Sequence, residues 1–257
     1  MDLGLDGRAV VITGASRGLG WYVARRLAAE NCALAICARG AEPLHEAARR
    51  LRDEYGVPVH AEAVDVTDHD RLTAFVERSA ETLGGLHGLV VNAGGGRGGL
   101  LDASTPQDWA AVFDVNVVHA ATAVRAAAPH LAGGGSAVLI SSISGWKPAP
   151  SAQYAAAKAA MIHMSASLAR ELGPRRIRVN AVSPGSLLIP GGGWDRFRAE
   201  RPDEYQRFLA EFPTGELVDP DDVAAVVAFL LSARARAVSG ANIPVDAAQN
   251  APSALGY

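Results

Sequence analysis

The chain has 257 residues, of which 49% are hydrophobic, and a formal net charge of −3. This length and composition suit a single domain, 1–257, with a sizeable core. The slightly acidic pI, near 6.2, argues against a nucleic-acid-binding surface. The chain has no run near the roughly 20 apolar residues of a membrane span, and its start is too acidic for a signal peptide. We therefore expect a cytoplasmic protein with no membrane contact.

Lysine and cysteine are both rare. The 24 basic residues comprise 22 arginines and two lysines, Lys147 and Lys158. A lysine kept in such a chain can mark a task that guanidinium cannot perform, although arginine bias can also reflect genome composition. Cys32 and Cys37 lie in an apolar run, which indicates buried small hydrophobes. The seven histidines show no ligand spacing, so we expect no metal site.

Short apolar runs alternate with amphipathic helical patterns along the chain. We expect strands at 9–13, 33–37, 57–64, 88–92, 137–141, 179–182 and 243–245. Helical patterns occupy 19–30, 42–55, 71–83, 106–131, 152–172 and 221–232. Apolar strands without alternation are typical of parallel strands buried on both faces. The predicted fold is therefore α/β, a single-domain, Rossmann-type doubly wound parallel sheet of about seven strands with helices on both faces.

One segment, 186–213, interrupts this alternation. It contains three consecutive glycines, then Trp194 and a charged helical pattern at 195–211. Long insertions of this kind are usually functional, so we expect a substrate lid over about 186–213. A surface excursion without a function is the alternative.

A glycine-rich turn lies between the first expected strand and the first expected helix. Glycines permit a tight turn and a close backbone approach to a pyrophosphate, and the helix N-terminus supplies N–H donors and a positive dipole. The spacing is G-x-x-x-G-x-G, and a purely structural turn remains the alternative. The expected cofactor contacts in this turn are Gly14, Ser16, Arg17, Gly18, Leu19 and Gly20.

The second strand is followed by Arg39, where a carboxylate would bind the ribose hydroxyls of NAD. Arg17 and Arg39 could together bind a 2′-phosphate through their planar guanidinium groups. This pattern favours NADP(H) over NAD(H), with solvated surface arginines as the alternative.

Tyr154 and Lys158 are four residues apart, so they project from one face of an alanine-rich helix. An ammonium about 4 Å from a phenol is worth roughly 4 kcal/mol at an effective dielectric near 20. We therefore expect Lys158 to lower the pKa of Tyr154 by up to about three units, toward neutrality.

Further polar residues follow expected strands or interrupt an apolar helix. Ser142 follows the fifth strand, and Asn92, Ala93 and Gly94 end the fourth, at the edge where doubly wound sheets bind ligands. Asn116 lies in the apolar helical run 106–131, so it requires a buried partner.

Together these motifs resemble the short-chain dehydrogenase/reductase superfamily over nearly the whole chain, nearest to the 3-oxoacyl-carrier-protein-reductase-like ketoreductases. The matching residues are T-G-x-x-x-G-x-G at 13–20, Asp65-Val66, Asn92-Ala93-Gly94, Asn116, Ser142, Tyr154-x-x-x-Lys158, Asn180 and Pro184-Gly185.

The resemblance implies a role for each matching residue. Tyr154 would act as the general acid, Ser142 would stabilise the substrate oxygen, Lys158 would bind the nicotinamide ribose, and Asn116 would hold a relay water. The implied cofactor contacts beyond the glycine turn and Arg39 are Asp65, Val66, Asn92, Ala93, Gly94, Tyr154, Lys158, Pro184, Gly185 and Leu187. A homotetramer with helices 106–131 and 152–172 at its interface is also implied.

Three departures from the family pattern affect the loops. Ser142 and Tyr154 are twelve positions apart where many relatives have thirteen. The common V-D-G-G is here Val245-Asp246-Ala247-Ala248, which affects C-terminal packing or tetramer contacts. Glycines at 133–135 replace the basic residues that relatives use to dock acyl carrier protein. Arg175 and Arg176 remain, so carrier-protein docking is a weakened hypothesis.

The leading functional hypothesis is an oxidoreductase that reduces a small-molecule ketone with NADPH. The substrate would be a 3-oxoacyl thioester, a polyketide-like ketone or a cyclic ketone. Candidate substrate-binding residues are Ser144, Trp146, Gln153 and Trp194, with core packing as the alternative for the tryptophans. Oxidation of a steroid, sugar or cyclic alcohol with NAD(P) is the alternative activity. A non-catalytic protein that binds the cofactor as a sensor or serves as a scaffold is the remote alternative.

Overall fold

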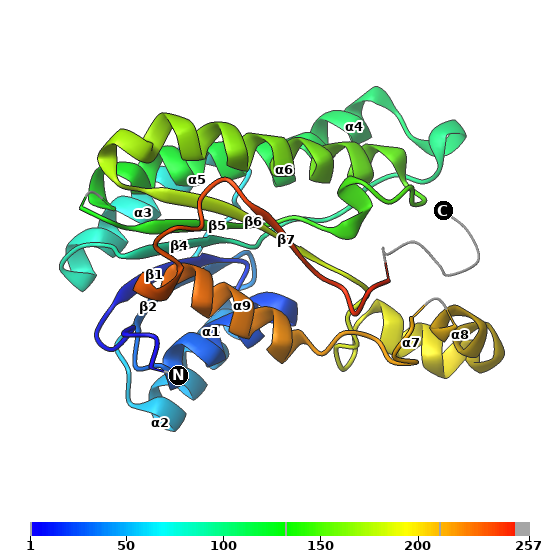
Figure 1. Cartoon of the computed structure of the whole chain (residues 1–257), viewed down its shortest axis with the longest axis horizontal. Coiled ribbons are helices and arrows are strands. Elements are labelled where there is room, and N and C mark those ends of the chain that lie inside the picture. Colours follow the sequence, from blue (N-terminus) through cyan, green and yellow to red (C-terminus); the bar gives the residue numbers. More distant parts are fainter. Residues whose placement is uncertain (1, 132, 211, 250–257) are drawn as a thin grey trace.

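The computed structural model describes residues 2–131, 133–210 and 212–249. Met1 and 250–257 of the expected domain, and Glu211 of the expected lid, lie outside the described residues. Seven parallel strands form one sheet in the order β3-β2-β1-β4-β5-β6-β7 (Figure 1). The strands are β1 Ala9–Thr13, β2 Ala33–Ala38, β3 Val59–Ala63, β4 Gly88–Val91, β5 Ser136–Ile140, β6 Arg178–Pro184 and β7 Asn242–Val245. The predicted Rossmann-type doubly wound fold is confirmed.

Helices cover both faces of this sheet (Figure 1). One face packs against α1 Gly18–Ala29, α2 Ala41–Tyr55 and α9 Pro220–Leu231. The other face packs against α3 His69–Leu83, α5 His119–Ala127 and α6 Ala152–Leu172. All five residues of β1 are buried, which explains why its sequence is apolar without alternation. No helix in the described part of the chain is both long and apolar enough to cross a membrane.

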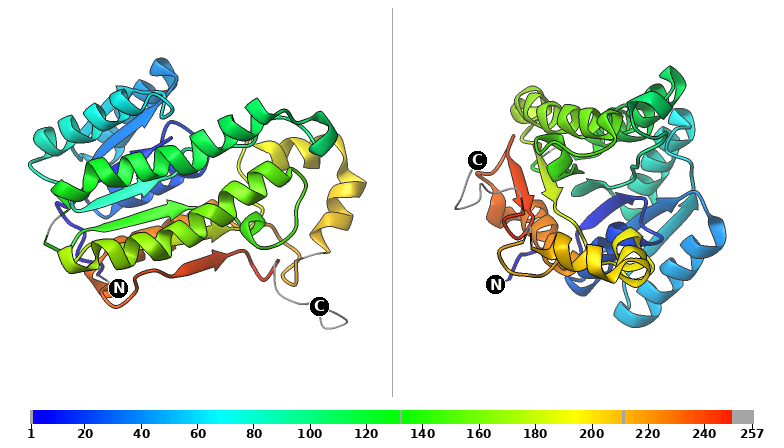
Figure 2. Two further views of the ribbon diagram at one scale, coloured as in Figure 1. Left: turned by 90° about the horizontal axis from the view of Figure 1, so that it is seen from above. Right: turned by 90° about the vertical axis from the view of Figure 1, so that its right-hand side faces the viewer.

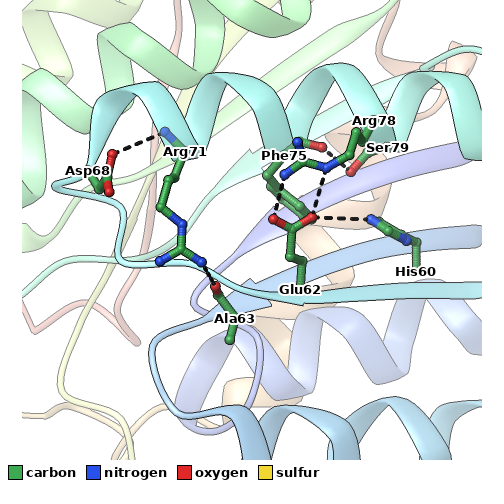
Figure 3. A network of polar contacts seen from close by, with 8 residues as sticks. All are labelled: His60, Glu62, Ala63, Asp68, Arg71, Phe75, Arg78 and Ser79. Atoms are coloured by element: carbon green, nitrogen blue, oxygen red, sulfur yellow. Dashed lines mark hydrogen bonds and ion pairs between the residues drawn. The ribbon is translucent and has the colours of Figure 1, made fainter.

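Polar contacts fix the edge strand β3 against α3 (Figure 3). Asp68 accepts a hydrogen bond from the Arg71 backbone at 3.1 Å and so caps α3, while the Arg71 guanidinium donates to the Ala63 carbonyl at 2.8 Å. Glu62 pairs with Arg78 at 2.5 Å across the same surface. These contacts define the β3–α3 turn, which carries Asp65 and Val66.

The helix expected at 106–131 is interrupted. It begins with α4 Pro106–Phe113, passes through a π-helical turn at Asp114–Val118, and continues as α5. Asn116 is fully buried, and its Nδ2 donates to the Val112 carbonyl at 2.8 Å. The side chain thereby takes the acceptor that an α-helix would reserve for the Asn116 backbone N–H, which explains the wider turn.

The expected lid contains two helices, α7 Gly193–Glu200 and α8 Pro202–Leu209, where the sequence pattern predicted one. Pro202 explains the break, because the residue before a proline is disfavoured in the helical region and Arg201 is accordingly non-helical. Both helices lie beyond the carboxyl ends of the strands (Figure 2). Trp194 of α7 stacks on Phe208 of α8, with ring centroids 4.1 Å apart.

Asn180 provides a test of how β6 is joined to β7. Its buried amide donates to the Val238 carbonyl at 2.9 Å and accepts from the Ala241 N–H at 3.0 Å. We expect Asn180→Ala to lower the free energy of unfolding by about 1–3 kcal/mol, because two backbone groups lose their partner.

Urea unfolding at one protein concentration measures this loss. Gln206→Ala removes an exposed amide on α8 and is the control, expected to change stability by less than about 0.5 kcal/mol. An Asn180→Ala protein as stable as this control would contradict the assignment.

Candidate active site

The glycine-rich turn lies at the switch point of the sheet, between the neighbouring strands β1 and β4. Gly14 and Gly18 have φ of +69° and +61°, which favour glycine. A Cβ on Gly20 would lie 2.2 Å from the Gly14 carbonyl oxygen, so no larger residue fits. Among the described residues no side chain caps the first turn of α1, whose N–H groups are therefore suited to an anion. This turn fits the pyrophosphate of a dinucleotide.

Asn92 connects the end of β4 to this turn. Its Nδ2 donates to the carbonyls of Thr13 and Gly14, each at 3.0 Å. The Thr13 hydroxyl in turn accepts from the Asn92 and Ala93 backbone N–H groups at 3.0 and 3.1 Å. The structure thus brings the expected residues of β1 and β4 together and gives Asn92 a positioning role.

His119 also contacts this group of residues, and the sequence did not single it out as a site residue. Its Nε2 lies 3.4 Å from the Thr13 hydroxyl. Burial lowers the pKa of His119 to about 4, so the imidazole is neutral at physiological pH. The spacing of the histidines did not indicate its buried position directly after the π-helical turn.

Arg17 and Arg39 are both exposed beside the glycine turn and the end of β2. Asp65 follows β3, and hydrogen bonds from Thr67, and to a smaller extent the charge of Arg39, hold the pKa of its carboxyl below its usual range. The neighbouring Val66 is buried. Arg17 and Arg39 therefore each present an exposed guanidinium group, one in the glycine turn and one after β2.

Ser142 and Tyr154 converge at the carboxyl end of β5. Ser142 begins the turn after β5 and accepts from the Ser144 backbone N–H at 3.1 Å. Its hydroxyl is hydrogen bonded to the Tyr154 phenol. Burial raises the pKa of Tyr154, and this hydrogen bond lowers it in part.

Lys158 lies behind the phenol and is almost fully buried. Its Nζ donates to the Ile140 carbonyl at 2.9 Å and lies 5.5 Å from the centre of the Tyr154 ring. Burial lowers the pKa of Lys158 to about 7. The expected lowering of the Tyr154 pKa is therefore not found, because burial dominates at the phenol and the lysine is only partly charged at neutral pH.

Asn116 of the π-helical turn and Gly94 of the loop after β4 both lie next to Lys158. The Asn116 amide donates to the Gly95 carbonyl at 2.8 Å, and its Oδ1 accepts from the Gly95 N–H at 3.3 Å. A Cβ on Gly94 would lie 2.6 Å from the Asn116 Oδ1 and 3.2 Å from the Lys158 Nζ. Glycine at position 94 therefore allows the strand end, the amide and the ammonium to lie together.

The end of β6 closes the opposite side of the site. A Cβ on Gly185 would lie 2.8 Å from the Cα of Asp246, so the backbones approach closely here. Gln249, which the sequence did not mark, accepts from the Ser186 N–H at 2.9 Å and donates to its hydroxyl at 3.1 Å. Leu187 pairs with Val218 and anchors the start of the expected lid.

A cavity of about 470 Å³ opens at Ser142 and Tyr154. Of the expected substrate residues, Ser144 and Trp194 line it, whereas Trp146 is exposed outside it and Gln153 is buried away from it. The Gln153 amide instead donates to the carbonyls of Arg97 and Gly99 at 2.7 and 3.1 Å, and so holds the loop after β4. The lining also includes residues that were not predicted as site residues, among them Lys147, Phe208 and Gln249.

A second cavity, of about 540 Å³, lies between the expected lid and helices α1 and α9. Arg25 and Asp221 form an ion pair in its wall at 2.5 Å. Neither Ser142 nor Tyr154 lines it, so the hydroxyl pair is associated with the smaller cavity.

Comparison with known proteins agrees with this geometry. A family profile described as enoyl-(acyl carrier protein) reductase matches residues 14–248. A 3-oxoacyl-[acyl-carrier-protein] reductase of Staphylococcus aureus is 32% identical, with 93% of this chain and 96% of that protein covered.

Solved structures show the same fold. A short-chain dehydrogenase from Burkholderia cenocepacia in complex with NADP is 36% identical with a TM-score of 0.88, covering 96% of this chain and 99% of that one. L-sorbose reductase from Gluconobacter frateurii, complexed with NADPH and L-sorbose, is 31% identical with a TM-score of 0.89. The match covers 96% of this chain and 98% of that one. This chain belongs to the short-chain dehydrogenase/reductase superfamily and is an NAD(P)-dependent oxidoreductase.

Proposed function

We propose that the protein reduces a small-molecule ketone to a secondary alcohol with NADPH as the reductant. The observation that carries this proposal is the hydrogen-bonded Ser142–Tyr154 pair, which opens onto the cavity while Lys158 lies buried behind it. A site for a carbonyl oxygen requires hydroxyl donors of this kind beside a cofactor cradle.

Tyr154 is the proposed proton donor. Because its pKa is raised, the phenol stays protonated at neutral pH and can give its proton to the substrate oxygen. Ser142 donates a hydrogen bond to the same oxygen and stabilises the charge that develops there. NADPH bound at the glycine turn would supply the hydride.

Lys158 and Asn116 support this proton transfer. With a pKa of about 7, Lys158 can release a proton as the ammonium and accept one as the amine near physiological pH, and it would also bind the nicotinamide ribose. The Asn116 Oδ1 lies beside Gly94 and Lys158, where it would hold the water that reconnects this group to solvent. Together these side chains would resupply the proton that Tyr154 gives away.

The remaining cofactor contacts surround this group. The proposed set comprises Gly14, Ser16, Arg17, Gly18, Leu19, Gly20, Arg39, Asp65, Val66, Asn92, Ala93, Gly94, Tyr154, Lys158, Pro184, Gly185 and Leu187. Arg17 and Arg39 favour NADPH over NADH because two exposed guanidinium groups suit a 2′-phosphate.

The segment 186–213 is proposed as a lid over the substrate. Trp194 and Phe208 from its two helices line the same cavity as Tyr154.

We also propose a cytoplasmic homotetramer in which α4–α5 and α6 form the main interface. The half-exposed Val118 on the turn before α5, and the two free buried cysteines, agree with this proposal. Size-exclusion chromatography with light scattering tests the oligomeric state, and a monomer would contradict it.

Removing the Tyr154 hydroxyl tests the proton donor. We expect Tyr154→Phe to lower kcat for ketone reduction by at least about 100-fold, because general acid catalysis is lost. The dissociation constant of NADPH, measured by fluorescence titration, should stay within about threefold. Tyr55→Phe, at the distant end of α2, is the matched control. Near-normal turnover in Tyr154→Phe would refute the proposed role.

Reversing the charge of Arg39 tests the cofactor preference. We expect Arg39→Asp to weaken NADPH binding by about 10- to 100-fold and NADH binding far less, because a charged hydrogen bond to the 2′-phosphate is replaced by repulsion. Arg236→Asp makes the same charge change at an exposed position after α9 and should leave the ratio of the two affinities unaltered. An Arg39→Asp protein with the wild-type ratio would overturn the assignment.

Replacing Lys158 by arginine tests whether charge alone suffices. We expect Lys158→Arg to lower kcat/KM by at least about 100-fold, because the buried space beside Ile140 accommodates a compact amine and not a planar guanidinium. Lys158→Met, measured beside it with a thermal melt of each protein, separates misfolding from lost chemistry. A folded Lys158→Arg enzyme with wild-type kcat/KM would show that the lysine is incidental.

A further inference from the structure

The Thr13 hydroxyl, at the end of β1, joins two strands beyond the point where their pairing ends. The pairing of β1 with β4 extends to Ile12 and Val90. After that point the Thr13 hydroxyl accepts from the N–H groups of Asn92 and Ala93 at 3.0 and 3.1 Å. The carboxyl ends of these two strands form the switch point, where doubly wound sheets bind dinucleotides. A side chain thus continues the strand pairing at the edge of the expected cofactor site.

The hydrogen-bond capacity of this hydroxyl is fully used. A hydroxyl oxygen has two acceptor sites and one hydrogen to donate. The two N–H groups of β4 occupy both acceptor sites, so the Thr13 hydrogen must be donated elsewhere. Thr13 is fully buried, so bulk solvent does not receive it. The acceptor that the described residues supply is the Nε2 of His119, 3.4 Å from the hydroxyl oxygen.

His119 can accept this hydrogen in only one protonation state. Its Nε2 must carry a lone pair, so the ring is neutral and has its proton on Nδ1. The surroundings favour the neutral ring, because His119 is itself fully buried and burial lowers the pKa of its imidazole to about 4. A charged imidazolium would place a second hydrogen between Nε2 and the Thr13 hydroxyl. The hydrogen bond therefore runs from Thr13 to His119.

Fixing the Thr13 hydroxyl fixes the backbone on both sides of the glycine turn. Asn92 donates from its side chain to the carbonyls of Thr13 and Gly14, each at 3.0 Å. A Cβ on Gly14 would lie 3.0 Å from the Cα of Ala93, so the turn and the end of β4 approach closely. If the hydroxyl rotated, an N–H group of β4 would lose its buried acceptor. The orientation of this hydroxyl thus affects the geometry of the turn that fits a pyrophosphate.

We propose that His119 is a positioning residue for the dinucleotide, because it orients the Thr13 hydroxyl and so keeps the glycine turn and the end of β4 in their binding geometry. This inference rests on the proposed binding of NADPH at the glycine turn. It concerns the affinity for the dinucleotide and not the proton transfer at Tyr154. The alternative is that the imidazole only fills space in the core, and an apolar ring would then serve equally well.

Two substitutions separate the acceptor from the ring. His119→Phe keeps a planar ring and removes the acceptor, whereas His119→Gln keeps an acceptor and removes the ring. The readout is the Kd of NADPH, from fluorescence titration without ketone. We expect His119→Phe to raise this Kd by about 5- to 20-fold, because a buried hydrogen bond is lost, and His119→Gln to raise it by less than about threefold. The KM for NADPH should follow the Kd, with a much smaller change in kcat.

His130→Phe makes the same exchange at a half-buried position beyond the other end of α5 and is the matched control. It should leave the Kd of NADPH at its wild-type value. An unaltered Kd in His119→Phe, or weaker binding by His119→Gln than by His119→Phe, would overturn the inference.

Nitrogen NMR of the wild-type protein tests the same contact without depending on how a variant folds. With ¹⁵N-labelled histidine, the chemical shifts distinguish a protonated ring nitrogen from an unprotonated one. We expect the neutral ring of His119 to carry its proton on Nδ1 at neutral pH, with the signals assigned by their loss in His119→Gln. A proton on Nε2 would overturn the inference, because that nitrogen could not then accept from Thr13.

NADPH binding and ketone reduction are measured separately, which distinguishes this inference from the proposed function. The expected order of Kd values without turnover of any ketone would support the inference and contradict the proposed reductase. Turnover of ketones with an unaltered Kd in His119→Phe would do the reverse. Absence of NADPH binding by the wild-type protein would overturn both.

Discussion

The active site depends on the burial of Lys158 at the place where three segments meet. Its Nζ is held by the end of β5, lies behind the Tyr154 ring, and faces the end of β4 at a position that only glycine can occupy. Burial disfavours the charged form of this side chain, and the pKa of Lys158 falls from its ordinary value of 10.5 to about 7. The same burial keeps the phenol protonated, so one physical cause adjusts both groups for proton transfer near neutrality.

The polar contacts around this lysine also hold the fold. Asn116 opens the helix into a π-helical turn and binds both carbonyl and N–H of Gly95, while Asn92 binds the turn at Gly14. Each amide satisfies backbone groups that would otherwise be buried without partners. Asn92 thereby joins the ends of β1 and β4, and Asn116 holds the loop after β4, while Lys158 binds the end of β5.

The sequence predicted the strands and the placement of Tyr154 and Lys158 on one helix, because apolar strand runs and four-residue helical spacing are local patterns. It did not predict the direction of the Tyr154 pKa, because desolvation depends on the packing of the whole site. The places of Gln249 and Lys147 in the cavity wall were also missed. Gln249 meets Ser186 across 63 positions of chain, and no local pattern signals such a contact. For Lys147 a signal did exist, in the scarcity of lysine, but only the structure placed the residue in the cavity wall.

The central claim is that this site transfers a hydride from NADPH to a ketone carbon while Tyr154 protonates the oxygen. The most direct measurement uses NADPH deuterated on the transferable face of C4 and follows the alcohol product by mass spectrometry. The account predicts one deuterium at the carbinol carbon of each alcohol formed, with a single configuration at that carbon. NADPH consumption without deuterium in an alcohol product would contradict it.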